Sequence, residues 1–155
     1  MRLLFALLFG TTLLLAAPIP KEKPKVKDEE AILGKWEIDS FDSDGANTEL
    51  PKEILDTMRV VFDKDGKMKV TIVMQGRNSV QELDYKIDAE AKLKCFDSTS
   101  NSKTTKGIYQ LEGDVLKIAS GNRPNSERPT EFKAVKASNV SVIVLKRVVE
   151  EKKDK

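Results

Sequence analysis

The sequence predicts an all-β fold: an antiparallel up-and-down barrel of about eight strands, with a short helix between the first two. Apolar and polar residues alternate over many short stretches, which is typical of strands with one buried face. Turn-forming stretches rich in glycine, aspartate and serine separate these strands. The sequence lacks the long helical periodicity that crossovers between parallel strands require, so the strands are expected to run antiparallel. A sandwich of two sheets is the structural alternative.

Residues 34–40 form the predicted first strand and hold the only tryptophan of the chain. Trp36 and Ile38 point to one side of this strand, while charged residues occupy the other side. An indole offers one of the largest apolar surfaces that a side chain can bury. We therefore expect Trp36 to anchor the core.

The next stretches predict a turn, a short helix and a hairpin. Residues 42–45 carry a turn signal, and residues 50–56 predict one or two helical turns with a proline early, where its missing N–H costs nothing. Residues 58–62 and 67–74 both alternate, and the turn between them ends in Gly66, which can supply a positive φ. This is the clearest hairpin in the sequence.

The second half of the chain predicts further short strands and two polar loops. The predicted strands lie, in chain order, at residues 80–87, 91–96, 107–111, 115–119 and 140–148. Residues 97–106 contain no core residue and are predicted to be a loop, and residues 121–128 a second one. Glu131 is expected to pair with Arg128 or Arg123 and so to hold this second loop in place.

Apolar residues of the middle strands are the candidate lining of the barrel. An eight-stranded barrel has an interior that side chains can fill completely, so a filled core and a pocket for a small apolar molecule are both open. The residues expected to line or fill this interior are Met58, Phe62, Met68, Ile72, Leu83 and Tyr85.

The ends of the chain differ in composition from the middle. Residues 1–17 resemble a signal peptide, because Arg2 precedes an apolar stretch that ends in two alanines. The cleavage site is poor, so an uncleaved membrane anchor is the alternative. Residues 18–30 are rich in proline and lysine and predict a linker, residues 31–149 the folded domain, and residues 150–155 a charged tail.

Several kinds of chemistry are excluded or disfavoured by composition. The chain has no histidine, so Ser-His-Asp and Cys-His nucleophile systems are ruled out. Cys95 is the only cysteine, which prevents an intramolecular disulfide and leaves too few soft ligands for zinc; we expect it to be a small buried apolar residue. The formal net charge is +2 with mixed signs, which argues against nucleic acid. No metal and no cofactor are expected.

Gly34, Trp36 and Arg147 carry a resemblance to known barrels. A Gly-x-Trp on the first strand and an arginine late on the last strand are features of lipocalin and calycin barrels, which the sequence resembles. The resemblance implies that the Arg147 guanidinium packs across the Trp36 ring where the barrel closes, a favourable cation–π contact. These three residues are therefore expected to have a structural role.

Three further runs, at residues 107–114, 128–132 and 144–147, resemble a family of exported planctomycete proteins whose activity is not established. This resemblance covers about residues 32–147 and implies a secreted lipocalin-like domain without indicating a substrate. The expected function is an exported, non-catalytic barrel that binds a small apolar ligand. A structural or protein-contacting domain of the cell envelope is the alternative, with membrane association only through an uncleaved signal.

Overall fold

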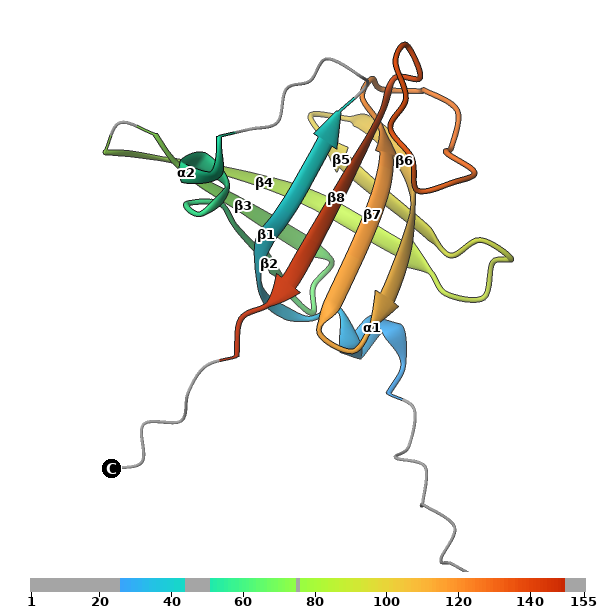
Figure 1. Cartoon of the computed structure of the whole chain (residues 1–155). Helices are drawn as coiled ribbons and strands as arrows, with labels where there is room; N and C mark the ends of the chain where they lie inside the picture. Colours follow the sequence, from blue (N-terminus) through green and yellow to red (C-terminus); the bar gives the residue numbers. More distant parts are fainter. Residues whose placement is uncertain (1–25, 44–50, 75, 150–155) are drawn as a thin grey trace, which may run out of the picture.

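The computed structural model describes residues 26–43, 51–74 and 76–149 (Figure 1). The predicted signal peptide, most of the predicted linker and the predicted charged tail lie outside the described residues. Two short helices accompany the strands. In chain order the elements are α1 (Asp28–Ala31), β1 (Gly34–Ser43), α2 (Lys52–Leu55), β2 (Arg59–Phe62), β3 (Lys67–Met74), β4 (Arg77–Asp88), β5 (Cys95–Ser100), β6 (Lys103–Glu112), β7 (Val115–Gly121) and β8 (Val140–Arg147).

The strands form one closed antiparallel barrel in sequence order, and β8 pairs with β1 to complete it. This confirms the predicted fold class, including the short helix between the first two strands. Closure leaves no strand edge without a partner, so the ladder satisfies the backbone hydrogen bonds around the whole circumference.

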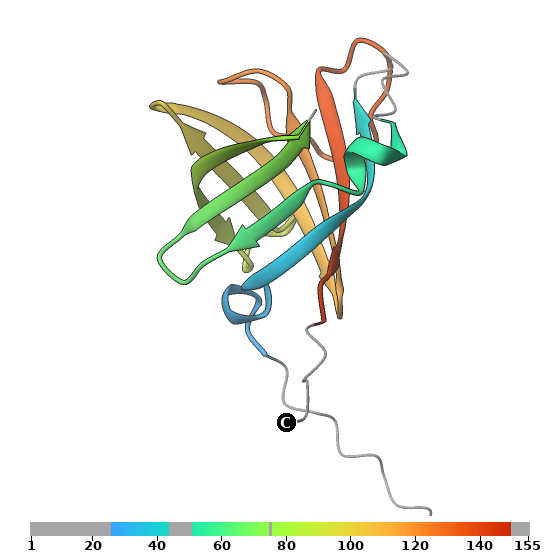
Figure 2. The same cartoon turned by 90° about the vertical axis from the view of Figure 1, so that its left-hand side faces the viewer.

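An up-and-down order places successive connections at alternate ends of the barrel. One end, here called the α1 end, holds α1 and the β2–β3, β4–β5 and β6–β7 connections. The opposite end, the distal end, holds α2, which lies between β1 and β2, and the β3–β4, β5–β6 and β7–β8 connections. Figures 1 and 2 agree that the chain enters through α1 and leaves from the end of β8 at the same, α1 end.

The core is concentrated toward the α1 end. Four large side chains are almost completely buried there: Trp36, Phe62, Leu116 and Leu145. Ile32, just after α1, packs against them and closes this end of the core. Phe62 meets the Tyr85 ring edge-on, with 5.0 Å between ring centroids. Such edge-to-face pairs add about 0.5–1.5 kcal/mol beyond the burial of area alone.

A second, smaller core lies outside the barrel wall. Ile108, Ala119 and Val142 are buried on the outer face of β6, β7 and β8, where Phe132 from the β7–β8 connection covers them. Arg128 holds this connection by pairing with Asp97 of β5, at 2.6 Å between Nη1 and Oδ1. The predicted partner of Arg128, Glu131, is thus replaced by a carboxylate 31 residues away.

Three boundaries predicted from the sequence were wrong. The strand predicted at 91–96 begins only at Cys95, and residues 97–106, predicted as a loop, belong to the β5–β6 hairpin, with Asn101 and Ser102 at positive φ in its turn. The inward residues nearest this turn are Ser98, Ser100 and Thr105, so this part of the hairpin shows no apolar alternation. Residues 42 and 43, predicted to lie in a turn, belong to β1, which pairs with β8 as far as Ser43. Residues 28–30, predicted to be the end of the linker, belong to α1.

Candidate functional site

The α1 end is sealed by an arginine over a tryptophan. The Arg147 guanidinium carbon lies 4.2 Å from the centroid of the Trp36 ring, the contact that the sequence predicts. Arg147 also donates to the Leu33 carbonyl oxygen at 2.8 Å and to the Ala31 carbonyl oxygen. Gly34 makes room for this contact: its φ is +113°, and an added Cβ would lie 3.3 Å from Nη1 of Arg147. The three predicted structural residues therefore act together.

A second set of contacts holds α1 against the barrel. Tyr109 donates its hydroxyl to Asp28 Oδ2 at 2.8 Å, and Lys94 Nζ lies 2.6 Å from the same oxygen. Burial raises the pKa of Tyr109 well above its ordinary value, and the hydrogen bond to the Asp28 carboxylate raises it further. The Tyr109 phenol therefore stays neutral and can donate its hydrogen bond to the Asp28 carboxylate.

This raised pKa predicts a loss of stability at alkaline pH. The folded state disfavours the phenolate, so the stabilisation is complete below the pKa of the unfolded chain, about 10, and falls as pH rises above it. Tyr109→Phe removes this titration. We expect the free energy of unfolding to fall less between about pH 9 and pH 11 in Tyr109→Phe than in the parent, as measured by urea unfolding. Lysine titration is common to both proteins, so parallel pH profiles would contradict the prediction.

The predicted lining residues do face the barrel interior, but they divide into two groups. Met58, Phe62 and Met68 are at most 9% exposed: Phe62 and Met68 lie in the sealed floor at the α1 end, and Met58 lies beside α2 just before β2, toward the distal end. Ile72, Leu83 and Tyr85 are half-buried and pack against that core from above. Only the second group has surface left that a ligand could cover.

Toward the distal end the inner face changes from apolar to hydroxylic. Strand register places Ser98 opposite Thr105 on β5 and β6, and Ser120 opposite Ser141 on β7 and β8, in line with inward-facing residues. All of these side chains are half-buried. We call the set the hydroxyl band; its members are Ser43, Ser98, Ser100, Thr105, Ser120 and Ser141.

The hydroxyl band was missed from the sequence. Ser98, Ser100 and Thr105 lay in the loop predicted at 97–106, and Ser43 in the turn predicted at 42–45. Residues 98–100 are three consecutive hydroxyl side chains, so no strand period distinguished the inward ones from the outward Thr99.

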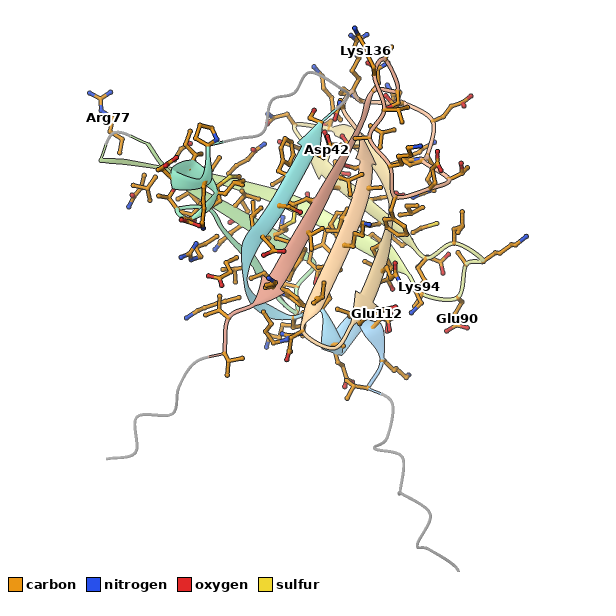
Figure 3. The ribbon with its side chains drawn as sticks, in the orientation of Figure 1. Asp42, Arg77, Glu90, Lys94, Glu112 and Lys136 are labelled. Carbon is orange, nitrogen blue, oxygen red and sulfur yellow. The ribbon has the colours of Figure 1, made fainter. Side chains whose placement is uncertain are left out.

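The inner face is almost free of charge. Along the described strands, the charged residues in line with the inward face are Arg147 in the floor and, at strand ends, Arg77 and Lys103. Figure 3 shows Arg77 at the tip of the β3–β4 hairpin, away from the barrel wall. The outer face carries ion pairs between neighbouring strands instead, such as Lys67 with Asp84.

A separate depression lies outside the floor, between α1, the β2–β3 turn and β4. Its volume is about 390 Å³, and charged residues of both signs, among them Glu29, Glu30 and Lys64, contribute to its lining. Tyr85 reaches it and donates its hydroxyl to the Asp63 carbonyl oxygen at 3.0 Å. Burial raises the pKa of Tyr85, as for Tyr109. Because its charges are of both signs and the Tyr85 hydroxyl already has an acceptor, we interpret this depression as a solvent-exposed gap between elements of the fold.

The described ranges hold no group of three histidine, cysteine, aspartate or glutamate side chains placed to bind a metal ion. Neither helix within them is long and apolar enough to cross a membrane. Cys95 is half-buried rather than buried, and its thiol lies 3.3 Å from the Leu93 carbonyl oxygen.

Comparison with solved structures finds low similarity to two structures of one fluorescent protein. A point mutant of the fluorescent protein UnaG superposes with a TM-score of 0.39 and 13% sequence identity, over 78% of this chain and 99% of that one. Wild-type UnaG gives 0.38 and 11%, over 77% and 98%. No protein-family profile and no curated protein sequence matches the chain.

Proposed function

We propose that this protein is an exported, non-catalytic β-barrel module that binds a small, largely apolar ligand in the distal half of its barrel. The observation that carries the proposal is apolar surface that faces inward without being buried. Phe41, Val70, Ile72 and Ile143 lie on the inner face near the distal end, yet each remains only half-buried. Covering such surface stabilises a complex by about 25 cal/mol per Å².

The sealed floor sets the direction of entry. Trp36 is fully buried under Arg147, and the aromatic cluster of Phe62, Tyr85 and Phe96 closes the barrel above it. A ligand would therefore enter from the distal end and stop against this aromatic layer. The layer is rigid and apolar, which suits a hydrocarbon chain or ring rather than a charged group.

Two features support the remaining parts of the proposal. The apolar stretch at residues 1–17 followed by the proline- and lysine-rich residues 18–30 supports export. Among the described residues, no carboxylate lies on the inward face of a strand, and the chain has no histidine. These strand faces therefore supply no pair of side chains that could act as general acid and general base.

Titration of the full chain with an uncharged, environment-sensitive fluorescent dye tests the proposal. We expect a saturable rise in emission with a blue shift, because the dye leaves water for the barrel. Ile143→Gln places a polar amide on the inner face and should weaken dye binding about fivefold, the equivalent of roughly 1 kcal/mol.

Val144→Gln is the matched control, because Val144 is the next residue of β8 and faces outward. Its dye affinity should stay within about twofold of the parent. Thermal melting of both variants separates lost binding from lost folding. A parent protein that gives no saturable signal would refute the proposal and favour the alternative, a protein-contacting envelope domain.

A further inference from the structure

We propose that the ligand is a neutral amphiphile, with an apolar chain or ring that enters first and an uncharged hydroxyl, carbonyl or amide head that hydrogen-bonds to the hydroxyl band. This inference rests on the proposed function and specifies the ligand class of the same site. It follows from the side chains on the inner face above the aromatic floor: half-buried aliphatic residues on β3 and β8, and hydroxyl side chains on β5, β6 and β7.

The hydroxyl band contains groups that are ready to bind. In the described part of the chain, the hydroxyls of Ser98, Thr105 and Ser120 have no protein hydrogen-bond partner. By contrast, Ser141 donates to Ser43, at 3.1 Å between the two Oγ atoms. A hydroxyl both donates and accepts, so the unpartnered members can match an alcohol, ester, ketone or amide equally well.

The position of the band fits a head group rather than a tail. Ser98 and Thr105 are register partners one step from Phe96 and Gly107, which lie opposite each other nearer the floor. Gly107 has no side chain, and an added Cβ would lie only 2.6 Å from the Ala119 carbonyl oxygen. No side chain therefore fits at this position beside the hydroxyl band. A molecule resting on Phe96 would therefore extend past these hydroxyls on its way out.

Charge argues against an ionised head. A carboxylate or ammonium moved from water to neutral hydroxyls loses hydration without gaining a counter-ion, which is costly. The inward-face cations nearest the distal end are Arg77, on a hairpin tip away from the barrel wall, and Lys103, which is exposed beside the β5–β6 turn. Arg77 lies outside the band, and Lys103 lies opposite Ser100, the band member nearest the rim, one step beyond the pair Ser98 and Thr105 that would hold the head group.

The test compares three ligands of equal chain length on the full chain: dodecanol, dodecanoate and dodecylammonium. Each displaces the uncharged dye at neutral pH, where both charged heads are ionised. We expect dodecanol to bind about tenfold more tightly than either ion, because only the ions lose hydration that the band cannot replace. Thr105→Lys should reverse the order between dodecanol and dodecanoate, since it adds an inward cation.

Two double variants on the same two strands provide the matched comparison. Ser98→Ala with Thr105→Ala removes an inward pair, and Thr99→Ala with Thr104→Ala removes the adjacent outward pair, whose hydroxyl oxygens lie 2.9 Å apart. The inward double variant should bind dodecanol about five- to tenfold more weakly. The outward variant should bind it like the parent, which also controls for loss of the hairpin.

The outcomes separate this inference from the proposed function. If the dye does not bind, the proposed function itself fails. If the dye binds but dodecanoate competes as well as dodecanol, the neutral-head inference is wrong while the binding function stands. Dodecanoate binding that Lys103→Gln abolishes would locate the head at the rim and overturn the inference in the same way. Equal effects of the two double variants would also overturn it.

Discussion

Replacing Trp36 with alanine should lower the free energy of unfolding by about 3–5 kcal/mol. The indole is completely buried, it is the largest buried side chain, and its Nε1 donates to the Ile32 carbonyl oxygen at 2.9 Å. The substitution leaves a cavity under α1 and frees Arg147 from its aromatic platform. Chemical denaturation followed by far-ultraviolet circular dichroism measures the effect, since the only tryptophan fluorophore is removed.

Two further variants serve as comparisons for the stability of Trp36→Ala. Trp36→Phe keeps an aromatic ring but loses the indole hydrogen bond, so its loss of stability should lie between those of the parent and the alanine variant. Val115→Ala changes an apolar residue that is 40% exposed and should alter stability by no more than about 0.5 kcal/mol. A Trp36→Ala loss as small as that of Val115→Ala would show that the α1 end is not the core.

Arg147→Ala should cost about 2–4 kcal/mol, the second-largest effect expected. The guanidinium combines a cation–π contact with Trp36, hydrogen bonds to the carbonyl oxygens at the end of α1, and a 3.0 Å contact with Asp114 at the β6–β7 turn. Arg147→Lys keeps the charge but not the planar fork, so it should recover only part of the loss.

Lys146→Ala is the control for this experiment. Lys146 is the neighbouring residue and also forms an ion pair, at 2.6 Å with Asp39, but both side chains are exposed. Exposed pairs contribute about 0–1 kcal/mol, so the control should change the denaturation midpoint little. If Lys146→Ala and Arg147→Ala shift the midpoint equally, the seal at the α1 end depends on net charge and not on the contacts described above.

The parts of the fold that could be predicted are those in which one face is apolar and the other polar. The β2–β3 hairpin alternates cleanly and turns at Gly66, whose φ of +74° matches the sequence signal. Trp36 and Arg147 were placed together by the resemblance to lipocalin and calycin barrels, in which such residues lie on the first and last strands. In both cases local pattern and tertiary structure agree.

The parts that could not be predicted depend on contacts between distant residues. Asp28 sits in a run of charged residues typical of a linker, and contacts with Tyr109, 81 residues away, and with Lys94 give it a structural role. Ile108 faces outward, yet it is buried because the β7–β8 connection covers it. The hydroxyl band was hidden for the opposite reason: its side chains face inward but are polar, so the usual link between apolarity and the inner face fails there.

The position of the two described chain ends has a consequence for how the barrel can be presented. Both leave from the α1 end, beside the sealed floor, and none of the hydroxyl band lies there. Anything joined to either flank, such as a surface, a second protein or a tag, would sit behind the floor. The distal end would then face outward, and a tethered barrel could exchange the proposed ligand with the surrounding medium without detaching.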